Sequence, residues 1–164
     1  MELLKFPDKS LFNACKEVTV FGEELKILLD GMWSVMLKGG GLGLASNQVG
    51  LDHRMFVMAG PDNEKIFLIN PQIIQRSEQP ANIREGCLSA PGEFLLLNER
   101  VFWVQVYFKD EKGAQHMRVF KGLHSVCVQH EIDHLDGKSH LMSKSIPKAQ
   151  RKQLYKKWGL KSNL

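Results

Sequence analysis

Apolar residues recur at helical spacing between positions 22 and 38. On a helix with about 3.6 residues per turn they fall on one face. They are Leu25, Leu28, Leu29, Met32, Val35 and Met36. The pattern predicts an amphipathic helix over residues 22–38, and Gly39 and Gly40 can end it because glycine is favoured just after a helix.

Farther along, apolar and β-branched residues gather in short runs bounded by turn-forming residues, a pattern typical of strands. The predicted strands cover residues 54–58, 65–69, 94–97, 101–108 and 116–120. Residues 110–113, Asp-Glu-Lys-Gly, predict a hairpin turn between the last two strands. Residues 75–84 are polar, contain Pro80 and predict an irregular loop.

Two more helices follow the strands. Leu123, Val126 and Cys127 lie on the helix face that also carries His130 and His134. A last helix is predicted at about residues 147–158, with a narrow apolar stripe of Ile146, Leu154 and Trp158. Helix, strands and helix without regular βα alternation predict an α+β fold, in which antiparallel sheets pack around the histidine-bearing helix.

Residues 39–50 contain five glycines in twelve positions. The simplest interpretation is a glycine-rich surface loop. The alternative is a backbone kept free of side chains so that a substrate can approach it. The segment alone does not decide between them.

Size and composition favour one compact domain over residues 1–164, since 43% of the residues are hydrophobic. No run reaches the ~20 apolar residues that span a bilayer, and the start of the chain has neither a signal nor a transit pattern. We therefore expect a cytoplasmic protein without membrane contact. Three cysteines, Cys15, Cys87 and Cys127, argue for reduced thiols rather than a disulfide scaffold.

The positive net charge of +4 comes from the end of the chain. From Lys144 onward there are seven basic residues and no acidic ones, whereas residues 1–143 carry 15 basic and 18 acidic residues. Such a basic helix is either a solvated face or a contact for a polyanion.

The strongest chemical signal is His130-Glu131-Ile132-Asp133-His134. Residues four apart on a helix share a face, so both imidazoles can reach one metal ion with Glu131 beside them. This spacing is typical of metal hydrolases. Catalytic metals usually take three protein ligands and leave a position for water, so a third ligand is needed.

Three sources of that ligand are possible. A downstream glutamate is excluded because none follows Glu131. His140 completes the His-Glu-x-x-His-x-x-Gly-x-x-His pattern of metzincin proteases, with His130 and His134 as the other ligands. Cys87 would instead give a Cys-His-His site, although a lone cysteine is more often a buried structural thiol.

Three motifs taken together resemble, in order and spacing, the signature motifs of the peptide deformylases. They are residues 41–48 (GLGLASNQ), 85–89 (EGCLS) and 130–134 (HEIDH). The resemblance covers nearly the whole chain and implies a hydrolase that removes the N-formyl group from the initiator methionine of nascent polypeptides, releasing formate. It also implies that Cys87, His130 and His134 bind the metal.

The resemblance further implies the catalytic groups. Glu131 would transfer protons, while the Gln48 amide and the backbone N–H of Leu88 would stabilise the oxyanion. Ser46 stands where the family usually has alanine. We expect this hydroxyl to be tolerated, provided that it finds a partner if buried.

Substrate contacts are implied in the same way. Leu42, Leu123, Val126 and Cys127 would line or border the methionine pocket, with the backbone of Gly43 facing the peptide. Arg100 would contact the outer end of the substrate groove, although the Asn98-Glu99 before it differs from the usual surroundings.

The resemblance favours one divalent ion, Fe(II), which Zn, Ni or Co could replace. The expected partners are formyl-methionyl nascent peptides, and the basic last helix could hold a monomeric enzyme at the ribosome; no DNA partner is expected. Two alternatives stay open. One is a metzincin, although only 24 residues follow His140 and Met142 is too close for a Met-turn. The other is a deformylase-like chain that binds peptide or metal without turnover.

Overall fold

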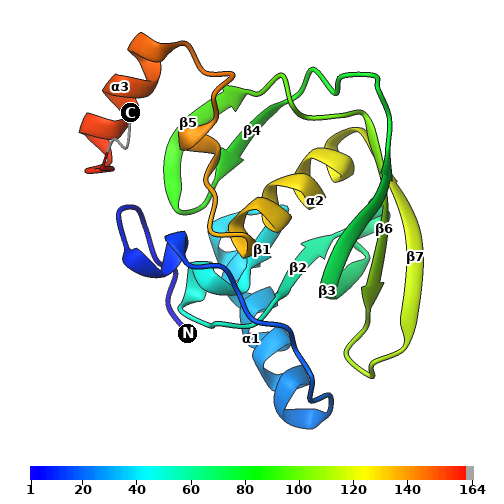
Figure 1. Cartoon of the computed structure of the whole chain (residues 1–164). Coiled ribbons are helices and arrows are strands. Elements are labelled where there is room, and N and C mark those ends of the chain that lie inside the picture. The colour runs from blue at the N-terminus through cyan, green and yellow to red at the C-terminus, as the bar shows by residue number, and fades with distance from the viewer. Residues whose placement is uncertain (162–164) are drawn as a thin grey trace.

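The computed structural model describes residues 1–161, which form two antiparallel sheets and three α-helices (Figure 1). The larger sheet has the strand order β1-β2-β3-β6-β7, and β4 pairs with β5 in the smaller one. The strands are β1 (Gly43–Ala45), β2 (Met55–Ala59), β3 (Lys65–Arg76), β4 (Arg84–Cys87), β5 (Ala90–Leu96), β6 (Trp103–Lys109) and β7 (Gln115–Lys121). The α-helices are α1 (Glu23–Gly39), α2 (Gly122–Leu135) and α3 (Lys148–Lys157).

Helix α2 lies between the two sheets, with the hairpin of β4 and β5 on one side and the larger sheet on the other (Figure 1). Its buried Val128, Ile132 and Leu135 pack with Phe56 of β2 and Val106 of β6 in one hydrophobic cluster. This arrangement confirms the predicted α+β fold, with antiparallel sheets around the helix that carries the two histidines.

Helix α1 covers the opposite face of the larger sheet. Its fully buried Leu29, Met32 and Met36 pack against Met55 and Val57 of β2. The side chains of a strand alternate between faces, so β2 points Phe56 towards α2 and its neighbours towards α1. The predicted helix is confirmed to within one residue, and Gly40 ends it in the left-handed conformation with φ 68°.

The predicted strand pattern is incomplete in four strands, one of which, β5, begins at Ala90 instead of residue 94. β1 and β4 are missing from it, because β1 has three residues and β4 four, too short for a hydrophobic period to show. β3 does not stop before Pro71 but continues to Arg76 through a register shift. At this irregularity Asn70 adopts a φ of 52°, and its side chain binds both backbone polar groups of Val18.

Helix α3 packs at the β4–β5 end of the molecule (Figure 1). Ile146 and Leu154 are buried in a third cluster with Leu95, and Trp158 packs against it, so the predicted apolar stripe is confirmed. Pro147 is the N-cap residue rather than part of the first turn. Within residues 1–161, no helix combines the length and the apolar character needed to cross a membrane.

Candidate metal centre

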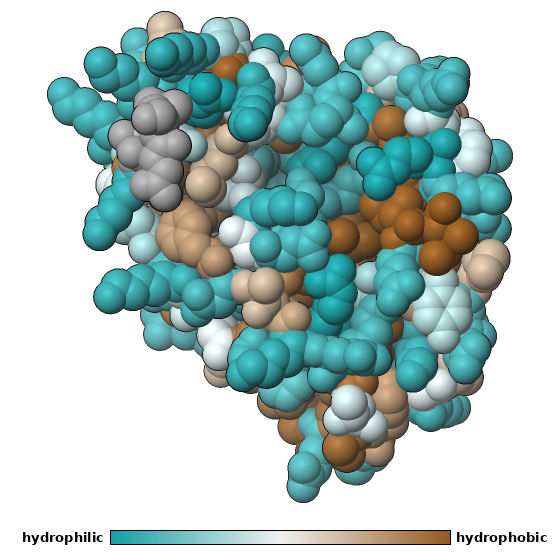
Figure 2. Space-filling model, viewed as in Figure 1, coloured by the Kyte–Doolittle hydropathy of each residue, from teal (hydrophilic) through white to brown (hydrophobic). Residues whose placement is uncertain are grey.

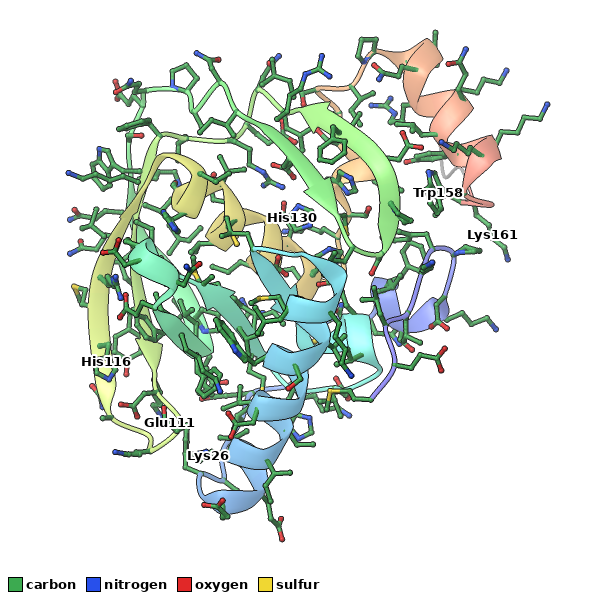
Figure 3. The ribbon with its side chains drawn as sticks, turned by 180° about the vertical axis from the view of Figure 1, so that it is seen from behind. Lys26, Glu111, His116, His130, Trp158 and Lys161 are labelled. Carbon is green, nitrogen blue, oxygen red and sulfur yellow. The ribbon has the colours of Figure 1, made fainter. Side chains whose placement is uncertain are left out.

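Helix α2 brings His130, Glu131 and His134 together inside the protein. The three side chains are buried, at 5%, 4% and 1% relative exposure. Because the two histidines are one helical turn apart, their Nε2 atoms both face the same point and lie 3.1 Å from each other. Figure 3 shows His130 in the interior of the molecule.

Cys87, the last residue of β4, supplies a third donor. Its Sγ lies 3.2 Å from Nε2 of His134, and the donor atoms of Cys87, His130 and His134 all lie within 4.8 Å of one another. We call these three residues the donor cluster. A thiolate and two imidazoles form an accepted ligand set for a divalent transition metal, so the residues present fit a single metal ion.

A second group consists of Glu85, Arg100 and Asp133 and contacts His130 at Nδ1, the ring nitrogen that does not face the donor cluster. We call it the support cluster. Oε1 of Glu85 accepts a hydrogen bond of 2.9 Å from Nδ1 of His130. With Nδ1 as donor, Nε2 of His130 is left as a lone-pair donor that faces the donor cluster. Glu85 lies in the second motif, but the partner that it orients could not be read from the sequence alone.

Arg100 neutralises Glu85 through two hydrogen bonds, of 2.6 Å from Nε and 2.8 Å from Nη2, and Nη1 donates to Asp133 at 2.7 Å. Burial raises the pKa of Glu85, but hydrogen bonds from Arg100 and His130 outweigh it and bring the pKa to about 2. Arg100 itself is only 4% exposed. The expected substrate contact of Arg100 is therefore corrected: its guanidinium is bound by the buried Glu85 and the partly exposed Asp133.

Glu131 lies in a dry setting beside β1. Burial raises the pKa of its carboxyl group to about 7, and its Oε2 has no hydrogen-bond partner among the described residues. A Cβ atom on Gly43 would lie 2.6 Å from Oε1 of Glu131 and 2.7 Å from Sγ of Cys127. Position 43 is therefore restricted to glycine by the close approach of α2 to the backbone of β1.

Gln48 reaches the donor cluster from the short 3-10 helix at Ser46–Val49, which directly follows β1. Its Oε1 accepts from the N–H of Ala45 at 2.9 Å, which fixes the amide so that Nε2 lies 3.1 Å from Oγ of Ser89 and 3.5 Å from Sγ of Cys87. Leu88 lies at the turn between β4 and β5. The structure thus brings the residues of all three motifs to one place.

A cavity of about 550 Å³ opens beside the donor cluster. The cavity is lined by the four residues expected at the methionine pocket, Leu42, Leu123, Val126 and Cys127, and by Gly43, whose backbone was expected to face the peptide. Gln48, Cys87, Leu88, His130 and Glu131 line it as well, but Arg100 does not. The glycine-rich segment 39–50 therefore forms a wall of this cavity and an edge strand, not a surface loop.

His140 does not belong to the donor cluster. It starts the 3-10 helix at His140–Met142, and its ring centroid lies 5.3 Å from that of His130. Burial lowers the pKa of His140 to about 3, so the ring is neutral. Cys87, not His140, completes the group that could hold a metal ion, which disfavours the metzincin alternative.

Ser46, the departure from the first motif, is fully buried. Its hydroxyl donates a hydrogen bond to the carbonyl of His53 and lies 3.5 Å from Sγ of Cys15. The buried hydroxyl therefore has a hydrogen-bond partner, as we expected for a serine that is tolerated at this position.

Residues 1–151 match the sequence profile of the family described as "Polypeptide deformylase". A "Peptide deformylase-like" protein of Agrobacterium fabrum is 35% identical over 156 residues, which are 95% of this chain and 93% of the relative. A "Peptide deformylase" of Alkalilimnicola ehrlichii is 36% identical over 160 residues, 96% of this chain and 88% of the relative.

Two solved structures have a similar fold. A peptide deformylase from Synechococcus elongatus, in complex with actinonin, has a TM-score of 0.88 at 31% identity over 98% of this chain and 86% of that one. A deformylase from the Vibrio parahaemolyticus bacteriophage VP16T, also in complex with actinonin, has a TM-score of 0.79 at 37% identity over 85% of this chain and 99% of that one.

Proposed function

The chain belongs to the polypeptide deformylase family, and on that premise we propose a mechanism by which its donor cluster and cavity remove the N-formyl group from the initiator methionine of nascent polypeptides. The enzyme is a metal-dependent amide hydrolase. The observation that carries this function is the convergence of Cys87, His130 and His134 within 4.8 Å beside a cavity.

Cys87, His130 and His134 would hold one divalent ion, which we infer to be Fe(II) in the cell, with Zn, Ni or Co able to replace it. When bound, the ion supplies a water molecule whose pKa is lowered towards ~7 and polarises the formyl oxygen. The support cluster keeps His130 in the tautomer that can ligate, because Glu85 accepts the proton on Nδ1 at 2.9 Å.

Glu131 is the proton carrier in this proposal. Its carboxylate accepts the proton of the attacking water and delivers it to the methionine nitrogen as the C–N bond to the formyl group breaks. The free amine and formate leave. Burial at 4% exposure keeps other water away from the carboxylate, so that a proton given to it is passed on to the leaving amine.

Gln48 and Leu88 stabilise the charge that develops on the formyl oxygen. Nε2 of Gln48 and the N–H of Leu88 are the donors that we assign to this oxyanion. The hydrogen bond from the N–H of Ala45 to Oε1 of Gln48, 2.9 Å long, fixes the amide before substrate arrives.

The peptide binds along β1 in this proposal. β1 pairs with β2 on one side only; on its other edge the Ala45 N–H is bound by Gln48, whereas the backbone of Gly43 borders the cavity, where an extended peptide pairs as an added strand. The methionine side chain then enters the cavity beside Leu42, Leu123, Val126 and Cys127.

Formate release from formyl-Met-Ala-Ser tests the function. We expect the wild type and His140→Ala to release formate, and Cys87→Ala to lose at least ~100-fold in rate because a ligand is removed. Activity lost in His140→Ala but kept in Cys87→Ala would support a metzincin-type site instead. Metal and peptide binding without any formate release would show a silent deformylase-like binder.

We also propose that this enzyme acts as a monomer in the cytoplasm and that α3 helps to hold it at the ribosome. Hydrophilic side chains dominate the surface around α3 (Figure 2), and Lys161 lies beyond its end (Figure 3). Lys148, Lys152 and Lys156 are exposed. Ribosomal RNA is polyanionic, so contacts with it weaken as salt rises.

Ribosome co-sedimentation at several salt concentrations tests this contact. A Lys148→Gln/Lys152→Gln/Lys156→Gln variant should bind more weakly and with a smaller salt slope. The matched control replaces three exposed lysines away from α3, Lys38, Lys112 and Lys121, by glutamine. Equal binding of the two variants would reject the proposal.

A further inference from the structure

The hairpin of β4 and β5 exposes two large apolar side chains near the cavity, and the exposed Arg84 lies opposite the second of them. Phe94 is 63% exposed and lines the cavity, and Leu96, two residues farther along the same face of β5, is 47% exposed. An exposed apolar side chain that also lines a cavity can contact a ligand bound there.

Phe94 is held in place by a glycine of β4. A Cβ atom on Gly86 would lie 2.8 Å from Cε1 and 3.1 Å from Cδ1 of Phe94. The ring therefore packs onto the backbone of β4 directly before Cys87, the proposed metal ligand. Any larger residue at position 86 would push the ring away from the strand.

The side chain next to Phe94 does not make the rim acidic. The carboxylate of Glu93 is bound by Nζ of Lys157 and by Nε1 of Trp158, the latter at 3.1 Å, and both donors come from the end of α3. Its charge is thus directed towards α3 and compensated there. Phe94 therefore presents apolar surface at this part of the rim, while the basic Lys5 and Arg84 also line the cavity.

Leu123 continues the apolar surface from α2. It lines the same cavity and is 51% exposed. An extended peptide advances ~3.3 Å per residue. When the first residue places its side chain in the cavity and its formyl group at the donor cluster, the next two residues must leave past the cavity rim. The occupant of the rim is therefore the substrate itself, downstream of its methionine.

We propose that Phe94 sets a substrate preference: this deformylase favours nascent peptides with an apolar side chain within the two residues after the formyl-methionine. The inference rests on the proposed function of the site. It concerns the sequence of the substrate beyond the methionine.

The test compares kcat/KM for formate release from formyl-Met-Ala-Ser, formyl-Met-Leu-Ser and formyl-Met-Ala-Leu. For the wild type, at least one leucine peptide should exceed formyl-Met-Ala-Ser by about 10-fold, the scale of a well-placed apolar contact. Phe94→Ser should bring that ratio to about one, and Phe94→Leu should restore most of it, since an apolar side chain is enough.

The control is Ile74→Ser, which removes an exposed apolar side chain of β3 (49% exposed) that does not line the cavity, and its ratio should equal that of the wild type. Two outcomes would overturn the preference alone. In the first, the wild type releases formate from all three peptides with leucine-to-Ala-Ser kcat/KM ratios near one. In the second, Phe94→Ser leaves the ratio unchanged. No release from any peptide by the wild type would overturn the proposed function as well. Melting curves check that each variant is folded.

Discussion

The donor cluster and the support cluster meet at His130 and differ in how their polar atoms are satisfied. In the support cluster, Glu85 and Arg100 form two direct hydrogen bonds, and Arg100 also binds Asp133. In the donor cluster, Nε2 of His130, Nε2 of His134 and Sγ of Cys87 face one another at 3.1 and 3.2 Å. These are three electron-pair donors that need a common cation.

This difference separates two roles that burial alone does not distinguish. When one partner of a buried ion pair is removed, the other charge is left uncompensated inside the protein, which is costly for the fold. Buried ligand atoms that face one another reach their full stability only with the ion that they bind. Mutations in the two clusters should therefore show in different measurements. Those in the support cluster should change the free energy of unfolding, and those in the donor cluster should change metal binding and turnover.

The largest expected effect comes from breaking the support cluster. Arg100→Met leaves Glu85 buried without its cation, which should lower the free energy of unfolding by about 3–5 kcal/mol. Urea unfolding of the metal-free protein measures it. Arg54→Met, which removes a half-exposed pair with Asp136, is the control and should cost about 1 kcal/mol or less. Equal losses in the two variants would mean that the support cluster does not stabilise the fold in the way its geometry indicates.

The donor cluster should respond to metal instead. Adding Ni²⁺ to the metal-free wild type at about 100 times its dissociation constant should stabilise the folded protein by about 2.7 kcal/mol. For a chain of 164 residues this corresponds to a rise in Tm of about 5–10 °C. Cys87→Ala should lose most of this shift at the same metal concentration, while His140→Ala should keep it. A full shift in Cys87→Ala would remove Cys87 from the ligand set.

Gln48 lies beside the donor cluster, so its substitution should change turnover and not metal binding. Gln48→Leu removes the amide donor, and turnover of formyl-Met-Ala-Ser should fall by about 100-fold, the scale of a lost oxyanion donor. The metal-induced rise in Tm should persist, because the three ligands remain. Turnover close to that of the wild type would exclude Gln48 as an oxyanion donor.

The two clusters also differ in how far they could be predicted from the sequence. Spacing along one helix placed His130 and His134 together, because a 3.6-residue period fixes which residues share a face. The third ligand, Cys87, lies 47 positions from His134. Residue spacing left it as one candidate beside His140, and the resemblance of three motifs was needed to choose it.

The support cluster could not be derived in this way. Glu85 and Arg100 meet because the fold brings β4 and the segment after β5 together. The spacing of residues along the sequence does not predict such a contact. Arg100 was instead predicted to contact substrate, because the sequence around it does not indicate that its guanidinium is bound by carboxylates of the protein itself. The glycine of the short strand β1 likewise depends on a residue of another element, because a Cβ atom at position 43 would meet Glu131.

The smallest expected effect concerns a buried hydroxyl outside both clusters. Ser46 is fully buried and donates to the carbonyl of His53, so Ser46→Ala should lower the free energy of unfolding by about 1 kcal/mol, the net worth of an ordinary hydrogen bond. Turnover and the metal-induced rise in Tm should stay as in the wild type, because this hydroxyl faces His53 and Cys15 rather than the donor cluster. Urea unfolding and formate release measure the two quantities on the same sample. A clear loss of turnover in the folded variant would show that this serine positions the neighbouring Gln48, and that the working site extends beyond the residues that contact the metal and the substrate.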